Sequence, residues 1–207
     1  VQLVKSGYVC LAIDSRGWNE RGDGSDKPFG QRDKCNVNGN KAVLLGYVLM
    51  ALDIFDHRRA LDYLASRPDV DPRRLGSVGL SFGGTMSLWT AALDERIQAA
   101  VVSGYLCTWH AFAVELNQFC GSQCCPGIAR WAAMSDVAGL IAPRAVLIES
   151  GTQDAIFPIA SAREAFAHLQ TIYAAAGASA RCRHDIFEGD HRYNGEKVPA
   201  FFAEFLR

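Results

Sequence analysis

The chain has 207 residues, of which 49% are hydrophobic and 21% charged, and its formal net charge at pH 7 is −1. This composition is typical of a globular domain with one hydrophobic core, and the balanced charge gives no electrostatic basis for a nucleic-acid partner. The longest apolar run, residues 42–55, contains Asp53 and is too short to span a membrane comfortably. We expect it to form part of a buried helix, and we expect no membrane partner.

Short apolar runs rich in β-forming residues alternate along the chain with longer amphipathic segments. The runs predict strands over 8–14, 74–80, 97–104, 144–150 and 180–187, and the longer segments predict helices over 41–66, 84–94, 159–177 and 195–207. A long polar loop follows the first strand, and an irregular insertion rich in aromatic residues and cysteines covers 105–134. The alternation predicts an α/β fold, with a mainly parallel sheet covered by helices on both faces, in a single domain over 1–207.

A Gly-x-Ser-x-Gly motif lies where the strand over 74–80 meets the next helix. It consists of Gly79, Ser81 and Gly83, and Gly84 follows it. Glycines permit a sharp, strained turn that would aim the Ser81 hydroxyl beyond the sheet, as a nucleophile requires. The same turn would place the Phe82 backbone N–H at a helix N-terminus, where it can donate to a developing oxyanion. The alternative is a tight turn without chemistry, but the strand–turn–helix context favours the nucleophile.

Two further residues fall just after later strands, at the sheet edge where an α/β fold gathers its ligands. Asp154 follows the strand over 144–150, and His191 follows the strand over 180–187. In the order Ser81, Asp154, His191, the histidine would accept the serine proton and the aspartate would orient the imidazole. Separately, an aspartate in such a place is often a turn residue and a histidine is often structural, so their joint placement carries the prediction. No metal or cofactor is needed for this chemistry.

The insertion over 105–134 is a candidate wall of a substrate pocket. Tyr105, Trp109 and His110 lie in it, beyond the strand over 97–104, where a loop can line a site. The alternative is a small satellite core beneath the loop, and the sequence does not separate the two interpretations.

The seven cysteines are odd in number and irregularly spaced, which does not indicate a disulfide scaffold. Free thiols are the favoured interpretation, in a cytoplasmic rather than a secreted protein. A bridge between Cys35 and the group Cys120, Cys124 and Cys125 is the alternative, because both loops follow strands at the same sheet edge. The group lacks the paired C-x-x-C spacing of a zinc site, so metal binding is disfavoured.

Several segments together resemble the α/β-hydrolase superfamily: "GYVCLAIDSRGWNERG", "ALDYLASRPDVDPRRLGSVGLSFGG", "IAPRAVLIESGTQDAIFP" and "FEGDHRYNGEKVPAFFAEFL". Within it they are most similar to the acetyl xylan esterase and dienelactone hydrolase-like group, which borders the prolyl oligopeptidase-type catalytic domains. The resemblance covers nearly the whole chain and implies Ser81 as nucleophile, Asp154 as acid and His191 as base. Dienelactone hydrolase itself has a cysteine nucleophile, so the serine here favours ordinary ester hydrolysis.

The resemblance also implies a truncated amino end, because the five predicted strands match the last five of a family sheet of eight. The second oxyanion donor normally follows the third family strand, so no residue of this chain can be assigned to it. An exposed apolar sheet edge would result, covered by an upstream segment or by a second copy in a homo-oligomer. The expected function is that of a serine carboxylesterase acting on a small ester, with short-chain or sugar acetyl esters as substrates. The alternatives are a serine peptidase of the prolyl oligopeptidase type and an inactive truncated hydrolase fold.

Overall fold

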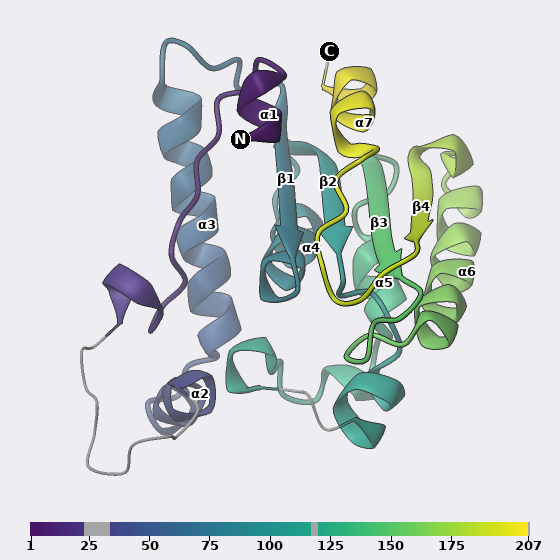
Figure 1. The fold of residues 1–207 in the computed structure, drawn as a ribbon. Helices are drawn as coiled ribbons and strands as arrows, with labels where there is room; N and C mark the ends of the chain where they lie inside the picture. The colour runs from purple at the N-terminus through teal and green to yellow at the C-terminus, as the bar shows by residue number, and fades with distance from the viewer. Residues whose placement is uncertain (23–33, 117–119, 207) are drawn as a thin grey trace.

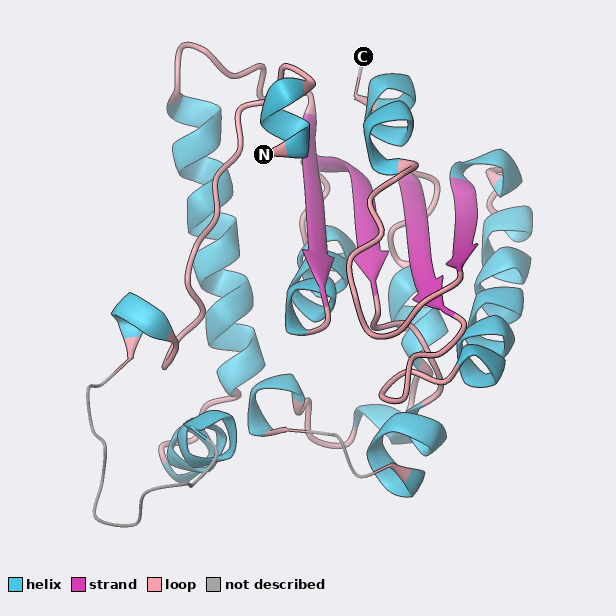
Figure 2. Cartoon of the chain, viewed as in Figure 1, coloured by secondary structure: helices cyan, strands magenta, loops and turns pink. Residues whose placement is uncertain are grey.

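Four parallel strands lie side by side in the order β1-β2-β3-β4, and all four point the same way in Figure 1 and Figure 2. The structure is a computed structural model, and it describes residues 1–22, 34–116 and 120–206. The strands are β1 (Leu75–Leu80), β2 (Ile97–Ser103), β3 (Ala145–Gly151) and β4 (Cys182–Phe187). The α-helices are α1 (Gln2–Lys5), α2 (Lys34–Leu44), α3 (Leu49–Ser66), α4 (Phe82–Leu93), α5 (Met134–Gly139), α6 (Ile159–Ala175) and α7 (Val198–Phe205). Shorter helical turns are η1 (Asn19–Arg21), η2 (His110–Glu115), η3 (Gly121–Gln123), η4 (Ile128–Arg130) and η5 (Ser179–Arg181).

The central strands β2 and β3 are buried on both faces, as their continuous apolar character requires, while β1 and β4 are partly exposed. On one face, α7 packs Phe201 and Phe202 against Val101 and Leu147. The larger core lies on the other face, where α4, α5 and α6 cover the sheet and α3 contacts α4. The predicted α/β class, with a parallel sheet between two layers of helices, is therefore confirmed.

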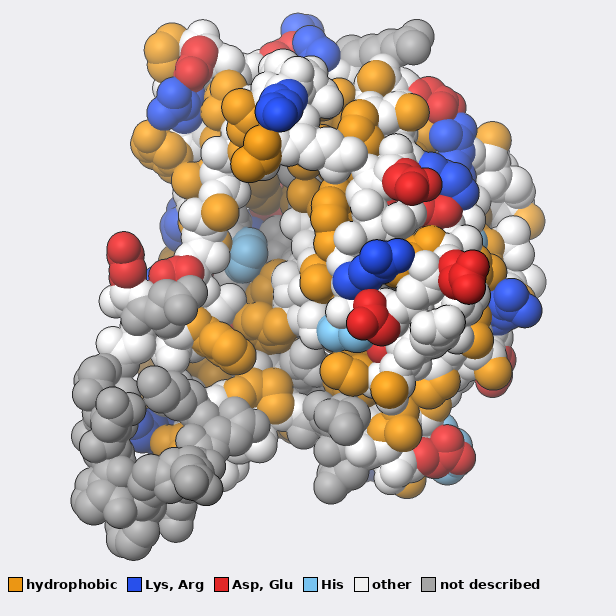
Figure 3. All heavy atoms as spheres, in the orientation of Figure 1, with side chains coloured by type: hydrophobic (Ala, Val, Ile, Leu, Met, Phe, Trp, Pro, Cys, Tyr) orange, Lys and Arg blue, Asp and Glu red, His pale blue; other side chains and the backbone are white. Residues whose placement is uncertain are grey.

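The predicted strand over 8–14 is wrong: this segment is extended, but it belongs to no sheet. A strand exists only where a neighbour accepts its backbone hydrogen bonds, and among the described residues β1 pairs on one side only, with β2. A cavity of about 840 Å³, lined by residues of 6–13, α3 and β1, separates the segment from that free edge. Figure 3 shows the surface hollowed between these two parts of the molecule.

The single helix predicted over 41–66 is also wrong, because the structure has two helices there. The first, α2, begins earlier than expected, inside the predicted polar loop, and ends at Leu44. Gly46 then adopts φ 79°, a left-handed conformation that ends a helix and that glycine reaches without steric cost. The second helix, α3, starts at Leu49 and buries Met50, Ile54 and Leu61. None of the described helices is long and apolar enough to cross a membrane.

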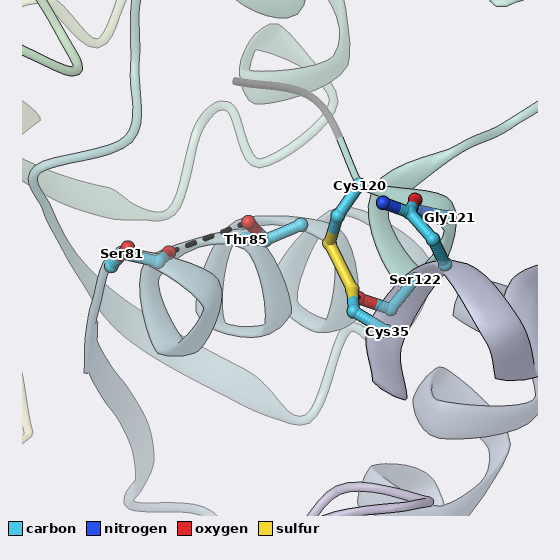
Figure 4. The surroundings of a disulfide bond; sticks show 7 residues. Cys35, Ser81, Thr85, Cys120, Gly121 and Ser122 are labelled. Atoms are coloured by element: carbon cyan, nitrogen blue, oxygen red, sulfur yellow. Dashed lines mark hydrogen bonds between the residues drawn. A yellow bond between two sulfur atoms is a disulfide. The ribbon is translucent and has the colours of Figure 1, made fainter. Parts of the chain in front are cut away.

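The insertion over 105–134 contains short helical turns, and a disulfide ties it to α2. Cys35 and Cys120 are bonded, with their Cα atoms 6.0 Å apart. The favoured expectation of free thiols is therefore wrong for this pair, because α2 reaches toward the insertion and brings the two sulfur atoms together. Ser122 lies beside the bridge, and Figure 4 draws it together with Ser81 and with Thr85 of α4. The remaining five cysteines are free.

Candidate active site

Ser81 occupies a strained turn between β1 and α4. Its backbone has φ 58° and ψ −119°, and it is the one non-glycine residue with a positive φ in the described part of the chain. Such a conformation costs about 1–3 kcal/mol and persists only where the surrounding structure enforces it. Here the Ser81 N–H donates to the Ser103 carbonyl (2.9 Å), and the Ser81 carbonyl accepts the Thr85 N–H (2.9 Å). The Thr85 hydroxyl also donates to that carbonyl, the bond dashed in Figure 4.

The start of α4 supplies hydrogen-bond donors next to Ser81. Phe82 is the first residue of the helix, so its backbone N–H is one of the leading donors that have no acceptor within the helix. The helix dipole favours negative charge at this end. The turn therefore offers one donor to an oxyanion that forms on a carbonyl bonded to Ser81.

His191 and Asp154 form a hydrogen-bonded pair. His191 Nδ1 lies 2.8 Å from Asp154 Oδ2, and the aspartate side chain is only 1% exposed. Asp154 Oδ1 accepts the N–H groups of Ile156 (2.8 Å) and Phe157 (2.9 Å). Burial by itself would raise the pKa of Asp154, but the hydrogen bonds from His191 and from these two N–H groups outweigh it, and the net pKa is lowered. An ionised carboxylate here fixes the Nδ1–H tautomer of His191 and leaves Nε2 free to accept a proton.

Gly104 brings the histidine to the turn that carries Ser81. Gly104 follows β2 with φ 53°, and a Cβ there would lie 3.0 Å from His191 Cε1 and 3.1 Å from Leu80 Cδ1. Because the Ser81 N–H is bonded to the carbonyl of Ser103, the residue before Gly104, the His191 imidazole and the Ser81 turn lie together at the ends of β1 and β2. Among the described residues, neither His191 nor any other side chain hydrogen-bonds the Ser81 hydroxyl. Such contacts are often long in a free enzyme and tighten when substrate binds.

Of the residues predicted to line a pocket, Tyr105 lies next to this turn, since a Cβ on Gly84 would lie 3.1 Å from Tyr105 Cβ. Tyr105 is 1% exposed, and its hydroxyl accepts a hydrogen bond from Trp89 Nε1 (3.3 Å) within the core. Burial raises the pKa of Tyr105. Trp109 donates from Nε1 to the Ala132 carbonyl (2.8 Å), within the insertion, and the exposed His110 pairs with Glu115.

Three residues that the sequence did not single out surround the candidate site. Phe157 stacks on the His191 ring, with centroids 5.4 Å apart, and Trp18 stacks on Phe82 at 6.4 Å. Gly104 is the third. Phe157 follows closely after Asp154, and this nearness in sequence was a signal that could have found it. Trp18 lies in the long polar loop, far from Phe82 in sequence, so only the fold shows their contact.

The described residues include no group of three or more histidine, cysteine or acidic side chains that could hold a metal ion.

Comparison with known proteins places the chain in a family. The family model described as acetyl xylan esterase matches residues 1–119, more than half of the chain. The chain belongs to the acetyl xylan esterase family. Among curated proteins, a hydrolase-type protein of Bacillus subtilis strain 168, YtaP, is 34% identical over 181 residues, which cover 86% of this chain and 57% of YtaP. The acetyl esterase Axe7A of Xylanibacter ruminicola is 32% identical over 110 residues, covering 48% of this chain and 24% of Axe7A.

Solved structures agree on the fold. An acetyl xylan esterase-type protein of Bacteroides fragilis superposes with a TM-score of 0.73 at 18% identity, over 96% of this chain and 50% of that one. A glucuronoyl esterase of Solibacter usitatus gives 0.62 at 20% identity, over 76% and 49% of the two chains. This member of the acetyl xylan esterase family therefore spans 57% of the length of YtaP and about half of each of the two solved structures.

Proposed function

We propose that the chain carries the catalytic site of a serine carboxylesterase, which hydrolyses short-chain or sugar acetyl esters through an acyl-enzyme. The observation that supports this most is the pairing of His191 Nδ1 with Asp154 Oδ2 at 2.8 Å, on a ring packed at Gly104 beside the strained Ser81 turn. Membership of the acetyl xylan esterase family supports the same reaction class. The residue order and the geometry thus favour one chemistry.

In the proposed acylation, the Ser81 oxygen attacks the ester carbonyl carbon while His191 Nε2 takes the hydroxyl proton. The carbonyl oxygen becomes an oxyanion that accepts a hydrogen bond from the Phe82 N–H. Asp154 stabilises the imidazolium without taking its proton. The tetrahedral intermediate then collapses: the bond to the alcohol oxygen breaks, and His191 returns the proton to that oxygen. An acyl group is left on Ser81.

In the proposed deacylation, water takes the place of the alcohol. His191 Nε2 removes a proton from the water as its oxygen attacks the acyl carbon. Collapse of the second intermediate breaks the bond to Ser81, and the proton on His191 returns to the serine oxygen. The products are one carboxylic acid and the free enzyme, with no net change in the side chains.

We also propose that residues 1–207 act as one catalytic domain and that a further strand covers the outer edge of β1. The cavity beside that edge separates two extended segments, and an unpaired edge of this kind attracts pairing. An upstream segment of a longer polypeptide or a second copy of the chain would supply the strand. Analytical ultracentrifugation over a range of concentrations distinguishes the two, because only a second copy makes the sedimentation coefficient rise with concentration.

The esterase proposal is tested with a short-chain aryl ester and with an organophosphonate that labels activated serines. The wild-type chain is expected to hydrolyse the ester and to gain one phosphonate on Ser81, detected by peptide mass spectrometry. Ser81→Ala is expected to lose about 10³-fold or more in kcat and to take up no label. Hydrolysis that survives in Ser81→Ala would contradict the proposed nucleophile.

The same experiment separates the alternatives. An aminoacyl anilide with a comparable leaving group reports peptidase activity, and cleavage of the anilide in preference to the ester would favour a peptidase of the prolyl oligopeptidase type. A folded chain that neither turns over the ester nor reacts with the phosphonate would favour an inactive hydrolase fold.

A further inference from the structure

His191 is carried on a loop over 188–197, between β4 and α7, and the first half of this loop is fixed to the turn that carries Asp154. The Thr152 N–H donates to the Phe187 carbonyl (2.9 Å), and the Gln153 N–H donates to the Gly189 carbonyl (2.8 Å). Gly151 leaves no room between the two segments, since a Cβ there would lie 2.5 Å from the Asp190 carbonyl oxygen. These contacts set the start of the loop relative to Asp154.

A buried glutamate fixes the second half of the loop. Glu149 on β3 has no exposed surface, and its Oε1 accepts the Gly195 N–H at 2.9 Å. Gly195 has φ 72°, and a Cβ there would lie 2.5 Å from the Tyr193 ring, so the turn is closely packed. The Gly195 carbonyl accepts a bond from the Gln2 side chain (2.9 Å). Both backbone groups of Gly195 are therefore held.

A second buried carboxylate lies next to Glu149 and holds the neighbouring loop residues. Glu149 is paired in register with Asp185 on β4, and Asp185 is 3% exposed. Asp185 accepts a hydrogen bond from Asn194 Nδ2 (2.9 Å) and forms an ion pair with Lys197. His191 thus lies between two fixed points, one on the turn of Asp154 and one on this pair of carboxylates.

Burying these carboxylates lowers the stability of the fold, and this indicates that they serve a role other than stabilisation. Burial raises the pKa of Glu149, while the hydrogen bond from the Gly195 N–H and the nearby Ser103 hydroxyl oppose the rise. Within the described residues, Glu149 Oε2 has no partner that meets hydrogen-bond geometry. A buried acid that is only half satisfied commonly contributes less to stability than an apolar side chain of the same volume. What an apolar side chain could not provide here is the acceptor for the Gly195 N–H.

We propose that Glu149 is a positioning residue, which holds His191 in line with Asp154 by accepting the Gly195 N–H. Asp185 supports it through Asn194 and Lys197. The proposal rests on the proposed function insofar as His191 is the general base, but the positioning itself does not depend on turnover. Displacing a catalytic group by about 1 Å can lower a rate about 10²-fold, so the contribution of Glu149 is measurable.

Two variants of Glu149 distinguish the role of its hydrogen-bond acceptor from the role of its side-chain volume. Glu149→Gln keeps the acceptor oxygen and the shape, and Glu149→Met keeps the volume without an acceptor. Asp53 offers a matched control: it is 1% exposed, its Oδ1 accepts one backbone N–H from Arg16 (2.9 Å), and its Oδ2 has no partner among the described residues. Asp53→Leu therefore removes a similar carboxylate that does not touch the loop over 188–197.

The first readout is the low-field proton NMR signal of His191 Nδ1–H, which reports its bond to Asp154 and is assigned by its loss in His191→Gln. The second readout is steady-state kinetics with a short-chain aryl ester, which gives kcat and KM separately. We expect Glu149→Met to broaden or lose the signal and to lower kcat about 10- to 100-fold, with KM changed by less than about twofold. Glu149→Gln and Asp53→Leu are expected to keep the signal and to stay within about threefold of the wild-type kcat.

The outcomes are distinct. An unchanged signal and kcat in Glu149→Met would overturn the proposal, and so would an equal loss in Glu149→Gln, since the acceptor is retained there. A wild-type chain without the low-field signal would overturn it as well. A wild-type chain that shows the signal but hydrolyses no ester would contradict the proposed function, while the NMR comparison would still decide the positioning role.

If Glu149→Met does not fold, Asn194→Ala is the second test. It removes the bond to Asp185 and is expected to broaden the His191 Nδ1–H signal to a smaller extent. An unchanged signal would count against the proposal.

Discussion

Gly79 and Gly83 lie in contact across the turn that carries Ser81, so that a Cβ on Gly79 would overlap the Gly83 carbonyl group. The two glycines of the Gly-x-Ser-x-Gly motif are not equivalent in this respect, because nothing lies within 4 Å of a Cβ built on Gly83. The close approach is needed because α4 starts directly over the end of β1.

Substitution of these two glycines is therefore expected to have opposite effects. Gly79→Ala should destabilise the fold by about 1–3 kcal/mol, as overpacking does, and should lower ester hydrolysis because the Ser81 turn must open. Gly83→Ala should stabilise the chain by up to about 1 kcal/mol, because alanine is the better residue within a helix. Urea unfolding of both variants measures the difference. Equal effects of the two substitutions would contradict the contact.

Asp154→Asn is expected to lower kcat about 10³- to 10⁴-fold. The amide oxygen can still accept the N–H groups of Ile156 and Phe157, so the turn should keep its shape. The amide nitrogen would then face His191 Nδ1 and favour the tautomer that carries the proton on Nε2, which cannot act as a base toward Ser81. Steady-state kinetics and a thermal unfolding curve are compared with those of the wild type. A kcat within tenfold of the wild-type value would show that Asp154 does not orient the base.

Reduction of the disulfide between Cys35 and Cys120 is expected to destabilise the chain without unfolding it at room temperature. The bond closes a long loop, with a sequence separation of 85, and removing such a crosslink typically costs about 2–4 kcal/mol. Cys35→Ser should show this loss in urea unfolding, whereas Cys10→Ser, at an exposed free cysteine, should change the free energy of unfolding by less than about 0.5 kcal/mol. In denaturant without reductant, five of the seven cysteines should react with a thiol reagent.

His184 is expected to make the fold sensitive to acid. The pKa of His184 is lowered to about 4, mainly by burial and also by the charges of Arg163 and Lys197, while Asp185 opposes the shift. In the unfolded chain the pKa is near 6.5, so the unfolded state binds the proton first as the pH falls. Stability should therefore decrease by about 2–3 kcal/mol between pH 6.5 and pH 4.

The matched variants for this test are His184→Gln and His168→Gln. His184→Gln keeps a partner for the Ser150 hydroxyl but cannot gain a charge, so its stability should change less with pH. His168→Gln is the comparison variant, because His168 bonds the Ser135 hydroxyl in a similar way but has a side chain that is 49% exposed. Urea unfolding at several pH values measures both. A His184→Gln curve that is as steep as the wild-type curve would contradict the assignment.

Local sequence patterns predicted four of the five expected strands and the turn at Ser81, because those features depend on nearby residues. The strand over 8–14 was not formed, since strand pairing depends on a neighbour that no local pattern reveals. The break at Gly46 was missed because an apolar run on both sides of a glycine resembles one continuous helix. The pairing of Cys35 with Cys120 depends on where α2 and the insertion meet in space. The hydrogen bond between Asp154 and His191 agrees with their places after neighbouring strands. The packing of His191 on Gly104 and Phe157 was not predicted.

The covalent ring closed by Cys35 and Cys120 contains α3, β1, α4 and β2, and thus Ser81. Part of this ring is open to solvent, since Leu44, Leu45 and Tyr47 are more than half exposed. A protease that cuts there would divide the backbone but not the molecule. The nicked protein would migrate as one species on a non-reducing gel and as two fragments after reduction. Proteolytic nicking and loss of the fragment that carries Ser81 are therefore separate events, and the second requires a reductant.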